Sequence, residues 1–302
     1  MSDVIAILCA DIHLSHKPPV ARSAEKSWYA AMRRPLDELS GLAEKHGVSV
    51  ICAGDVFDRW ASCPELINFA LEHLPEMYVV PGQHDLPNHN YEEKERSAYW
   101  TLVKAGMIDT LDDEGVCIEG IDLAGFPWGF SILSIDPAEN RLLVAVIHRF
   151  IYRKGKDGYP GAPVEQEVAG YRKELEGYDV AVFGDNHKGF LSKVGDCTVF
   201  NCGTMMRRKI DEVDYKPMVG LLRSDGTVEP YFLDCSEDKF MSADKLRVAD
   251  AAGLDLSKFM SELESLGGDE LDFRSVVDEY LDRKAVDQGV RKAVLQAMEG
   301  EL

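Results

Sequence analysis

The chain has 302 residues, 45% of them hydrophobic and 28% charged, which is the composition of an ordinary globular protein. This length predicts one large domain, or one large and one small domain. The formal net charge of -20 argues against a protein that binds nucleic acid through a broad basic surface. We expect no membrane helix and no secretory signal, because no apolar run approaches ~18 residues and no basic leader opens the sequence. Seven cysteines without zinc-binding spacing predict reduced thiols in a cytoplasmic protein.

The N-terminal third of the chain alternates between apolar strands and amphipathic helices. Strands are predicted at 4–10, 48–53 and 77–80, since these segments are apolar on both faces. Helices are predicted between and after them, at 23–45, 63–74 and 91–104. This β-α-β-α-β order is typical of a parallel sheet covered by helices.

The middle of the chain predicts a second sheet. Segments 116–119 and 121–125 flank Gly120 and suggest a hairpin. Further strands are predicted at 142–147, 179–183, 190–194, 197–201, 218–222 and 228–233. The last four are short and separated by turn residues, which favours a mixed or antiparallel arrangement. We therefore expect an α/β sandwich of two sheets over residues 1–235.

The strand pattern ends after Asp234, and 236–302 is predicted to be helical. Its candidate N-caps are Asp255, Asp272 and Asp287. Apolar residues recur there at helical spacing, for example Phe273, Val276, Val277, Tyr280 and Leu281. The region is too short for a large core of its own, so we expect either a cap on the first domain or a docking element for a partner.

Five predicted strands end in residue types that bind metal ions. The residues are Asp11, His13, Asp55, Gln83, His84, His148, Asp185 and His187. Asp11 and His13 can reach one ion, because side chains two apart on an extended chain point to the same face. The carboxyl ends of parallel strands gather at one edge of a sheet, which predicts one common site. Oxygen ligands with some imidazole suit manganese or magnesium and also accept iron.

Each of these short patterns has a simpler interpretation when it is taken alone. Asp-x-His can be a helix cap followed by a surface histidine, Gly-Asp can be a turn, and His148 can be a hydrogen-bonded structural histidine. Five strand ends that all carry ligand-type residues are hard to obtain from turn chemistry. We therefore interpret the set as a metal site.

Together these motifs resemble the calcineurin-like metallophosphoesterase superfamily over about residues 1–205. The motifs are Asp11-x-His13, Gly54-Asp55-x-x-Asp58, Gly82-Gln83-His84-Asp85, His148 and Gly184-x-x-His187. The resemblance implies a four-layer sandwich of two mixed β-sheets flanked by helices, with a short helical C-terminal tail, and a hydrolase that uses two metal ions. A narrower likeness, carried by 83–90 and 201–208, is to the SbcD branch, the nuclease subunit of DNA double-strand-break repair complexes, and especially to its compact phage and prophage forms.

The resemblance also implies roles for the site residues. The first metal would be held by Asp11, His13, Asp55 and His187, and the second by Asp55, Gln83, His148 and Asp185. Asp55 would bridge the two ions. His84 would protonate the leaving oxygen, steadied by Asp85, while Asp58 would support the ligands from behind.

Two positions depart from the superfamily pattern. Gln83 stands where Asn is usual, and Asp185 stands where the first His of Gly-His-x-His is usual. Glutamine keeps a carbonyl ligand on a longer stem, and aspartate adds negative charge. Both changes would fall on the same metal, and the added carboxylate favours a hard ion such as manganese.

Four further residues are candidates for substrate binding. Arg207 and Arg208 could bind phosphate, because guanidinium groups make bidentate contacts with phosphate oxygens. A solvated basic turn is the alternative for both. His16 and His89 lie near the motifs in sequence and could touch substrate, with structural or exposed roles equally open.

The resemblance favours a manganese-dependent DNA exonuclease or endonuclease in an SbcCD-type repair complex. It implies a homodimer and an SbcC-like coiled-coil ATPase, docked through the C-terminal helices, that could supply the DNA-binding surface this acidic chain lacks. The alternatives are a phosphoesterase for small-molecule or protein substrates, and a weakly active structural subunit that holds metal poorly. Deleting 240–302 should abolish partner binding but leave hydrolysis of a small phosphodiester intact.

Overall fold

The computed structural model describes residues 2–118, 120–135, 141–159 and 161–241. Met1–Met241 form one compact unit, and Ser242–Leu302 are assigned to a second. The helices predicted within 236–302 therefore lie almost wholly outside the described residues.

The first sheet has six strands in the order β12-β11-β1-β2-β3-β4. Its parallel half contains β1 (Val4–Cys9), β2 (Val50–Cys52), β3 (Met77–Val79) and β4 (Ile108–Thr110). Its antiparallel half adds β11 (Met218–Arg223) and β12 (Val228–Phe232). Cys9, Cys52 and Val79 are paired across β1, β2 and β3, so these three strands end level with one another.

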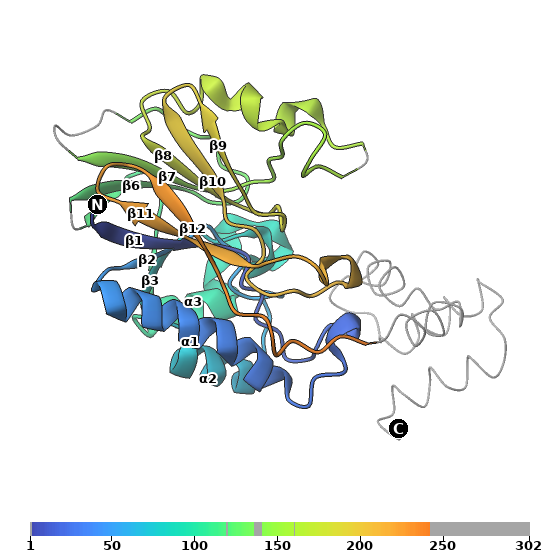
Figure 1. Ribbon diagram of the computed structural model, residues 1–302. Coiled ribbons are helices and arrows are strands. Elements are labelled where there is room, and N and C mark those ends of the chain that lie inside the picture. Colours follow the sequence, from blue (N-terminus) through green and yellow to red (C-terminus); the bar gives the residue numbers. More distant parts are fainter. Residues whose placement is uncertain (1, 119, 136–140, 160, 242–302) are drawn as a thin grey trace, which may run out of the picture. The chain divides into compact units, whose positions relative to one another are not determined.

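Three α-helices cover the outer face of this sheet: α1 (Trp28–His46), α2 (Pro64–His73) and α3 (Ala98–Lys104) (Figure 1). α1 begins five residues later than the predicted helix, because Ser27 caps it by accepting from the Ala30 N–H group. The predicted helix at 91–104 is a 3-10 helix, Tyr91–Arg96, followed by α3. Ser97 separates the two, and its side chain caps α3.

The second sheet also has six strands, in the order β5-β6-β7-β8-β10-β9. They are β5 (Val116–Ile118), β6 (Ile121–Phe126), β7 (Leu142–His148), β8 (Val180–Gly184), β9 (Phe190–Val194) and β10 (Cys197–Asn201). The predicted hairpin is confirmed, since β5 pairs antiparallel with β6. β6, β7, β8 and β10 are parallel, and His148 is paired with Gly184 at the end of β7 and β8.

The predicted sandwich of two mixed sheets is confirmed, and β1 shows how its layers are separated. Ile7 and Cys9 pack with the α-helices, whereas Ala6 and Leu8 pack with the second sheet. This alternation follows from the two-residue period of a strand. A third apolar cluster fills the outer face of the second sheet, beneath the short 3-10 helices Val164–Gln166 and Val168–Arg172.

Two expectations about strand placement were wrong. The strands near 218–222 and 228–233 belong to the first sheet, where β11 pairs antiparallel with β1, and not to the second. β4 was not expected at all, because its sequence Ile-Asp-Thr is not an apolar run like those of β2 and β3. Pairing partners depend on the long connection between β10 and β11, whose path a local pattern of apolar residues does not specify.

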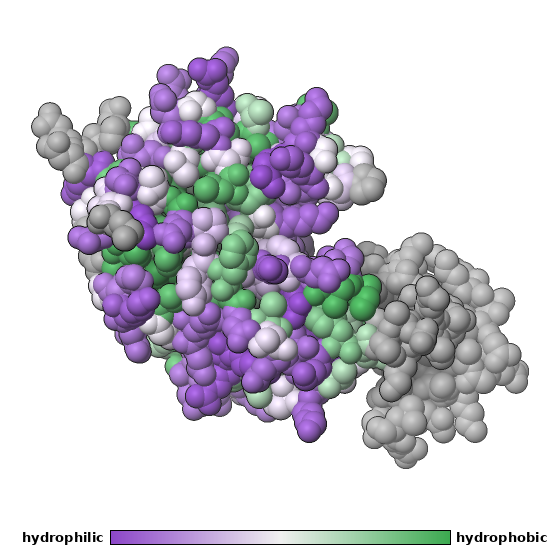
Figure 2. Space-filling model, viewed as in Figure 1, coloured by the Kyte–Doolittle hydropathy of each residue, from purple (hydrophilic) through white to green (hydrophobic). Residues whose placement is uncertain are grey.

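The face drawn in Figure 2 is mostly hydrophilic, with smaller apolar areas between the polar side chains. Among the described residues, no helix combines the length and the apolar composition that a bilayer crossing requires.

Candidate metal centre

The carboxyl ends of strands from both sheets meet at one cluster of aspartates and histidines. Asp11 and His13 follow β1, Asp55 follows β2, His148 ends β7 and His187 follows β8. Side-chain atoms of Asp11, His13 and His187 lie within 4.8 Å of one another, and so do those of Asp11, Asp55 and His148. The structure thus brings together five of the predicted metal ligands as two adjoining groups.

The first group contains two facing imidazoles. His13 Nε2 and His187 Nε2 are 3.1 Å apart, and His13 Nε2 is 3.8 Å from Asp11 Oδ1. In the second group, His148 Nε2 is 3.4 Å from Asp55 Oδ2. Asp55 Oδ2 is also 3.7 Å from His13 Nε2. Asp11 and Asp55 therefore both lie between the groups, whereas the resemblance implied a bridging role for Asp55 alone.

The two residues that depart from the superfamily pattern contact each other. Gln83 Nε2 donates to Asp185 Oδ1 (2.8 Å), and the Asp185 N–H group donates to both carboxylate oxygens of Asp11 (3.1 Å each). Gln83 Oε1 is buried without a hydrogen-bond partner. The amide is therefore turned so that its oxygen stays available as a ligand while its nitrogen holds the extra carboxylate.

The unsatisfied atoms of the cluster fit a pair of divalent cations. Asp55 Oδ2 and His148 Nε2 are buried and have no hydrogen-bond partner, like Gln83 Oε1. Buried polar atoms without partners are costly, and a cation held by Asp55 and His148 would satisfy the first two. The ring of His148 is already oriented for this, because its Nδ1 donates to the Ala53 carbonyl oxygen (2.5 Å) and its Nε2 faces Asp55.

The backbone around these ligands is strained. Asp11, His13, Asp55 and Asp185 have φ angles of 51°, 50°, 55° and 80°, in the left-handed region that non-glycine residues avoid. Each such residue costs about 1–3 kcal/mol and persists where the surrounding structure enforces it. Gly82 is needed for a different reason, since a Cβ atom there would collide with the carboxylate and the backbone nitrogen of Asp55.

Burial and mutual charge set the protonation of the cluster. Burial raises the pKa of Asp11 to about 7. Burial also acts to raise the pKa of Asp55, but the neighbouring His148 and His13 outweigh it and the pKa falls well below its ordinary value. Burial acts to lower the pKa of His148, yet Asp55 raises it well above the ordinary value. In the metal-free protein the raised pKa values of Asp11 and His148 therefore favour protons where a cation would bind, while Asp55 stays ionised.

Removing metal should destabilise the protein more at high pH than at low pH. Between its unfolded pKa of 3.8 and about 7, the folded metal-free protein keeps a proton on Asp11 that the unfolded chain has released, so stability falls as pH rises through this range. A bound cation keeps Asp11 ionised and removes that dependence. Thermal unfolding with and without a chelator should show a difference in Tm that grows from about pH 5 to about pH 8. An equal difference at both pH values would contradict this.

His84 lies at the exposed rim of the cluster. Its backbone N–H group donates to Asp55 Oδ1 (3.0 Å), and its ring Nδ1 donates to the Asp58 carbonyl oxygen (2.9 Å). The ring is edge-on to His13, with centroids 5.1 Å apart. These contacts leave Nε2 as the ring nitrogen available to a substrate. The Asp58 carboxylate lies 3.7 Å from His13 Nδ1 and pairs with Arg208 Nη2 (2.6 Å).

Two of the expected catalytic and substrate contacts are not formed. Asp85 is fully buried and accepts from the backbone N–H groups of Val56, Phe57 and Gly82, so it joins two loops and does not steady His84. The guanidinium group of Arg207 is engaged by Asp238 and two backbone carbonyls. Arg207 therefore donates to protein acceptors within the fold, which is a structural role.

Of the remaining substrate-binding candidates, one lies at the rim of the metal cluster and two lie farther out. Arg208 lies beside the cluster, where its Nη2 pairs with Asp58 Oδ1 (2.6 Å). His16 lies against Tyr29 and Cys63, away from the metal groups. His89 is exposed in the 3-10 helix Pro87–His89 and belongs to neither metal group.

Glu212 lies beside the metal-ligand candidate His187, and the sequence did not predict this contact. Its Oε1 lies 3.7 Å from His187 Nδ1, and its Oε2 accepts from the Arg208 and Lys209 N–H groups (2.5 and 2.9 Å). A carboxylate behind a histidine ligand fixes the ring and increases its basicity. Its sequence context, an acidic residue after a basic run, carries no signal of this contact.

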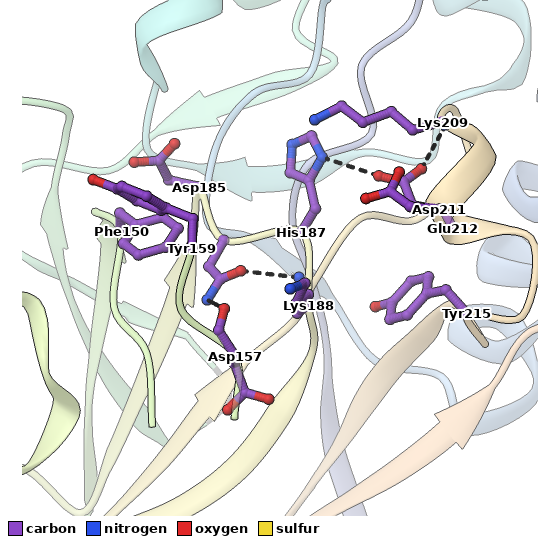
Figure 3. A pocket seen from close by; sticks show the side chains of 11 residues that line it. Phe150, Asp157, Tyr159, Asp185, His187, Lys188, Lys209, Asp211, Glu212 and Tyr215 are labelled. Atoms are coloured by element: carbon purple, nitrogen blue, oxygen red, sulfur yellow. Dashed lines mark hydrogen bonds and ion pairs between the residues drawn. The ribbon is translucent and has the colours of Figure 1, made fainter. Parts of the chain in front are cut away.

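A pocket of about 490 Å³ opens beside the cluster (Figure 3). Asp185 and His187 form part of its wall, and Phe150, Tyr159 and Tyr215 supply aromatic surface. Phe150 and Tyr159 pack edge to face with centroids 5.2 Å apart. Lys188 and Lys209 line it as well, together with Asn186, Asp157, Asp211 and Glu212. The pocket can therefore hold an organic group next to a phosphate at the metals.

Three comparisons with known proteins were made. No curated protein matches the chain. Solved structures with similar folds include TT1561 of Thermus thermophilus (14% identity, TM-score 0.47, 76% of this chain and 98% of that chain). Others are an archaeal phosphodiesterase (13%, 0.40, 76% and 99%) and a putative 5'-nucleotidase from Staphylococcus aureus (11%, 0.45, 82% and 57%). At these identities and scores the neighbours carry no information about substrate.

A family model described as calcineurin-like phosphoesterase matches residues 6–189. The matched region spans β1 to the loop after β8 and so contains both ligand groups. The chain belongs to the calcineurin-like phosphoesterase family, and it is a metal-dependent phosphoesterase.

Proposed function

We propose that the protein is a manganese-dependent nuclease that hydrolyses phosphodiester bonds in DNA. The observation that carries this proposal is the pair of ligand groups sharing Asp11, with His84 at their rim. Paired metal sites of this kind clamp both the attacking and the leaving oxygen of an in-line displacement at phosphorus. The carboxylate-rich donor set favours manganese, with magnesium or iron as the other candidates.

The residues of the chain divide the reaction between them. The bound ions supply Lewis acidity and an activated water. His84 Nε2 is available to give a proton to the leaving oxygen, while its Nδ1 bond to Asp58 fixes the ring. Arg208 is placed to contact a non-bridging phosphate oxygen. The burial of Asp11 and Asp55 limits the access of bulk water behind the ions.

The pocket supports a substrate with a flat ring beside its phosphate. Phe150 and Tyr159 offer aromatic surface on which a nucleobase can stack, and stacking tolerates any base. Lys188 and Lys209 supply two positive charges among the carboxylates of the pocket, where they can contact a phosphate. A nucleic-acid strand with one base in this pocket would present its adjoining phosphate to the metals.

Replacing Tyr159 with alanine should weaken the binding of a single-stranded oligonucleotide about fivefold or more, because one stacking contact is worth roughly 1–3 kcal/mol. The ring is 51% exposed, so its loss should not disturb the core. The measurement is KM for the oligonucleotide against kcat/KM for bis(p-nitrophenyl) phosphate, which has no base. Phe232→Ala removes another exposed ring, on β12, and is the matched control. Equal losses on both substrates would argue against a base subsite.

The direct test is incubation of linear single- and double-stranded DNA with the protein and Mn²⁺. Cleavage that disappears in Asp55→Asn would support the nuclease, since Asp55 belongs to the metal cluster. Hydrolysis of a small phosphodiester without cleavage of either DNA would favour a phosphoesterase for small-molecule substrates. The acidic residues of the pocket, Asp157, Asp211 and Glu212, are the observation that favours this second function. Failure on all substrates would indicate a weakly active structural subunit.

We further propose that the protein works as a homodimer with an SbcC-like coiled-coil ATPase, which docks on the C-terminal region. Truncation should follow Met241, because Asp238 and Phe240 contact Arg22 and Arg207 of the catalytic unit. Removing 242–302 should keep hydrolysis of a small phosphodiester and abolish binding of the ATPase, as measured by co-purification. Loss of hydrolysis together with loss of folding would remove the support for a docking role.

A further inference from the structure

A second group of metal-binding side chains lies outside the catalytic cluster. His16, Cys63 and Glu65 place one ligand atom each within 4.8 Å of the others. His16 belongs to the loop after β1, and the other two lie at the start of α2. No step of the proposed reaction uses any of these three residues.

Two distances within this group are close to those between ligands of one zinc ion. His16 Nδ1 is 3.3 Å from Cys63 Sγ and 3.7 Å from Glu65 Oε2. Around a tetrahedral zinc with ordinary bond lengths, nitrogen, sulfur and oxygen ligands stand about 3.3–3.6 Å apart. The two distances from His16 Nδ1 are thus close to these separations, and the third pair of atoms lies within 4.8 Å.

We propose that His16, Cys63 and Glu65 form a surface site for Zn²⁺, with the fourth position open to water. Thiolate, imidazole and carboxylate are the donors that zinc takes in proteins, and three protein ligands with one open position are a recurring zinc arrangement. The catalytic clusters consist of aspartates and histidines and lack thiolate, so the two sites differ in the metal they favour. The proposal does not depend on the substrate of the catalytic centre.

The framework around this surface site is fixed before any ion binds. Trp28 Nε1 donates to the Ser15 carbonyl oxygen (2.9 Å), which holds the backbone next to His16. Cys63 is the N-cap residue of α2, which sets its place relative to Glu65. The Tyr29 hydroxyl lies 3.0 Å from His16 Nδ1 and holds the imidazole ring in place. The side chains of His16 and Glu65 are 48% and 68% exposed, so an ion can reach them from solvent.

The test is titration of the reduced full-length protein with Co²⁺, followed by absorption in the near ultraviolet. Cobalt bound to a thiolate gives an intense sulfur-to-metal charge-transfer band, whereas oxygen and nitrogen ligands give none. The band therefore reports on the surface site even while the catalytic centre also binds cobalt. We expect saturation near one equivalent per chain at this site, and loss of the band when Zn²⁺ is added.

Three variants make the result decisive. Cys63→Ser should abolish the band, and His16→Ala should weaken cobalt binding at least tenfold. Cys117→Ser removes an exposed cysteine on β5 and should leave the band unchanged. Asp55→Asn, used as a further control, alters only the catalytic cluster and should also leave it unchanged, which separates this site from the catalytic metals. Absence of a band in excess cobalt, or a band that persists in Cys63→Ser, would overturn the proposal and leave an ordinary hydrogen-bonded cluster.

Discussion

Replacing His84 with alanine should lower kcat about 10²–10⁴-fold on substrates with a poor leaving group, because that is the contribution of a positioned proton donor. Its ring Nδ1 is bound to Asp58 and its Nε2 is left for the substrate. The loss should shrink as the leaving group improves, since a good leaving group departs without a proton. Steady-state kinetics on phenyl and p-nitrophenyl phosphodiesters would measure this dependence.

His89→Ala is the matched control, because His89 is an exposed histidine nearby in sequence that belongs to neither metal group. It should retain wild-type kcat on both esters. Calorimetric titration with Mn²⁺ should give the same stoichiometry for His84→Ala as for the wild type. A loss of equal size on both esters, or a missing metal equivalent, would mean that His84 acts on the metals and not on the leaving oxygen.

Replacing Asp238 with alanine should destabilise the catalytic unit by about 3–5 kcal/mol, the cost of breaking a buried ion pair from one side. Its Oδ1 accepts from Arg22 Nη2 (2.7 Å) and Arg34 Nη2 (3.0 Å), and its Oδ2 accepts from Arg207 Nε (3.0 Å). Arg22 is only 2% exposed, so it would keep a buried charge with Glu25 as its remaining carboxylate partner. Urea unfolding of the two proteins would give the difference.

The matched control for this change is Asp234→Ala, in the same C-terminal segment. The Asp234 side chain is exposed, and it accepts from the neighbouring Ser236 N–H group. Its loss should leave the urea midpoint almost unchanged. If Asp238→Ala unfolded at the wild-type midpoint, residues 234–241 would contribute little to the stability of the catalytic unit.

The first half of the fold and the metal cluster were predictable from the sequence for one physical reason. Strands buried on both faces read as unbroken apolar runs, so β1, β2, β7 and β8 were visible, and the ligand-type residue after each was visible too. Parallel pairing then brings those residues to one edge of the sheet. In the structure Cys9 is paired with Cys52, so β1 and β2 end level and their following residues lie together.

Contacts set by the tertiary path of the chain were not predictable in the same way. Arg207 and Arg208 are adjacent in sequence, yet one is held by Asp238 and the other lies at Asp58 beside the metal groups. The interpretation of Asp85 failed similarly, since nothing local shows that three backbone N–H groups from two loops surround it. Phe150 and Tyr159 gave no signal either, because an aromatic residue in a loop predicts neither a pocket nor its neighbours.

The hydrogen bond between Gln83 and Asp185 makes the effects of substitutions at these two positions non-additive. Asparagine at position 83 would be one methylene shorter and would lose the donor that holds the Asp185 carboxylate. Histidine at position 185 would replace that carboxylate acceptor with a ring. Changing both positions together to the usual asparagine and histidine should therefore cost less metal affinity than the sum of the two single changes.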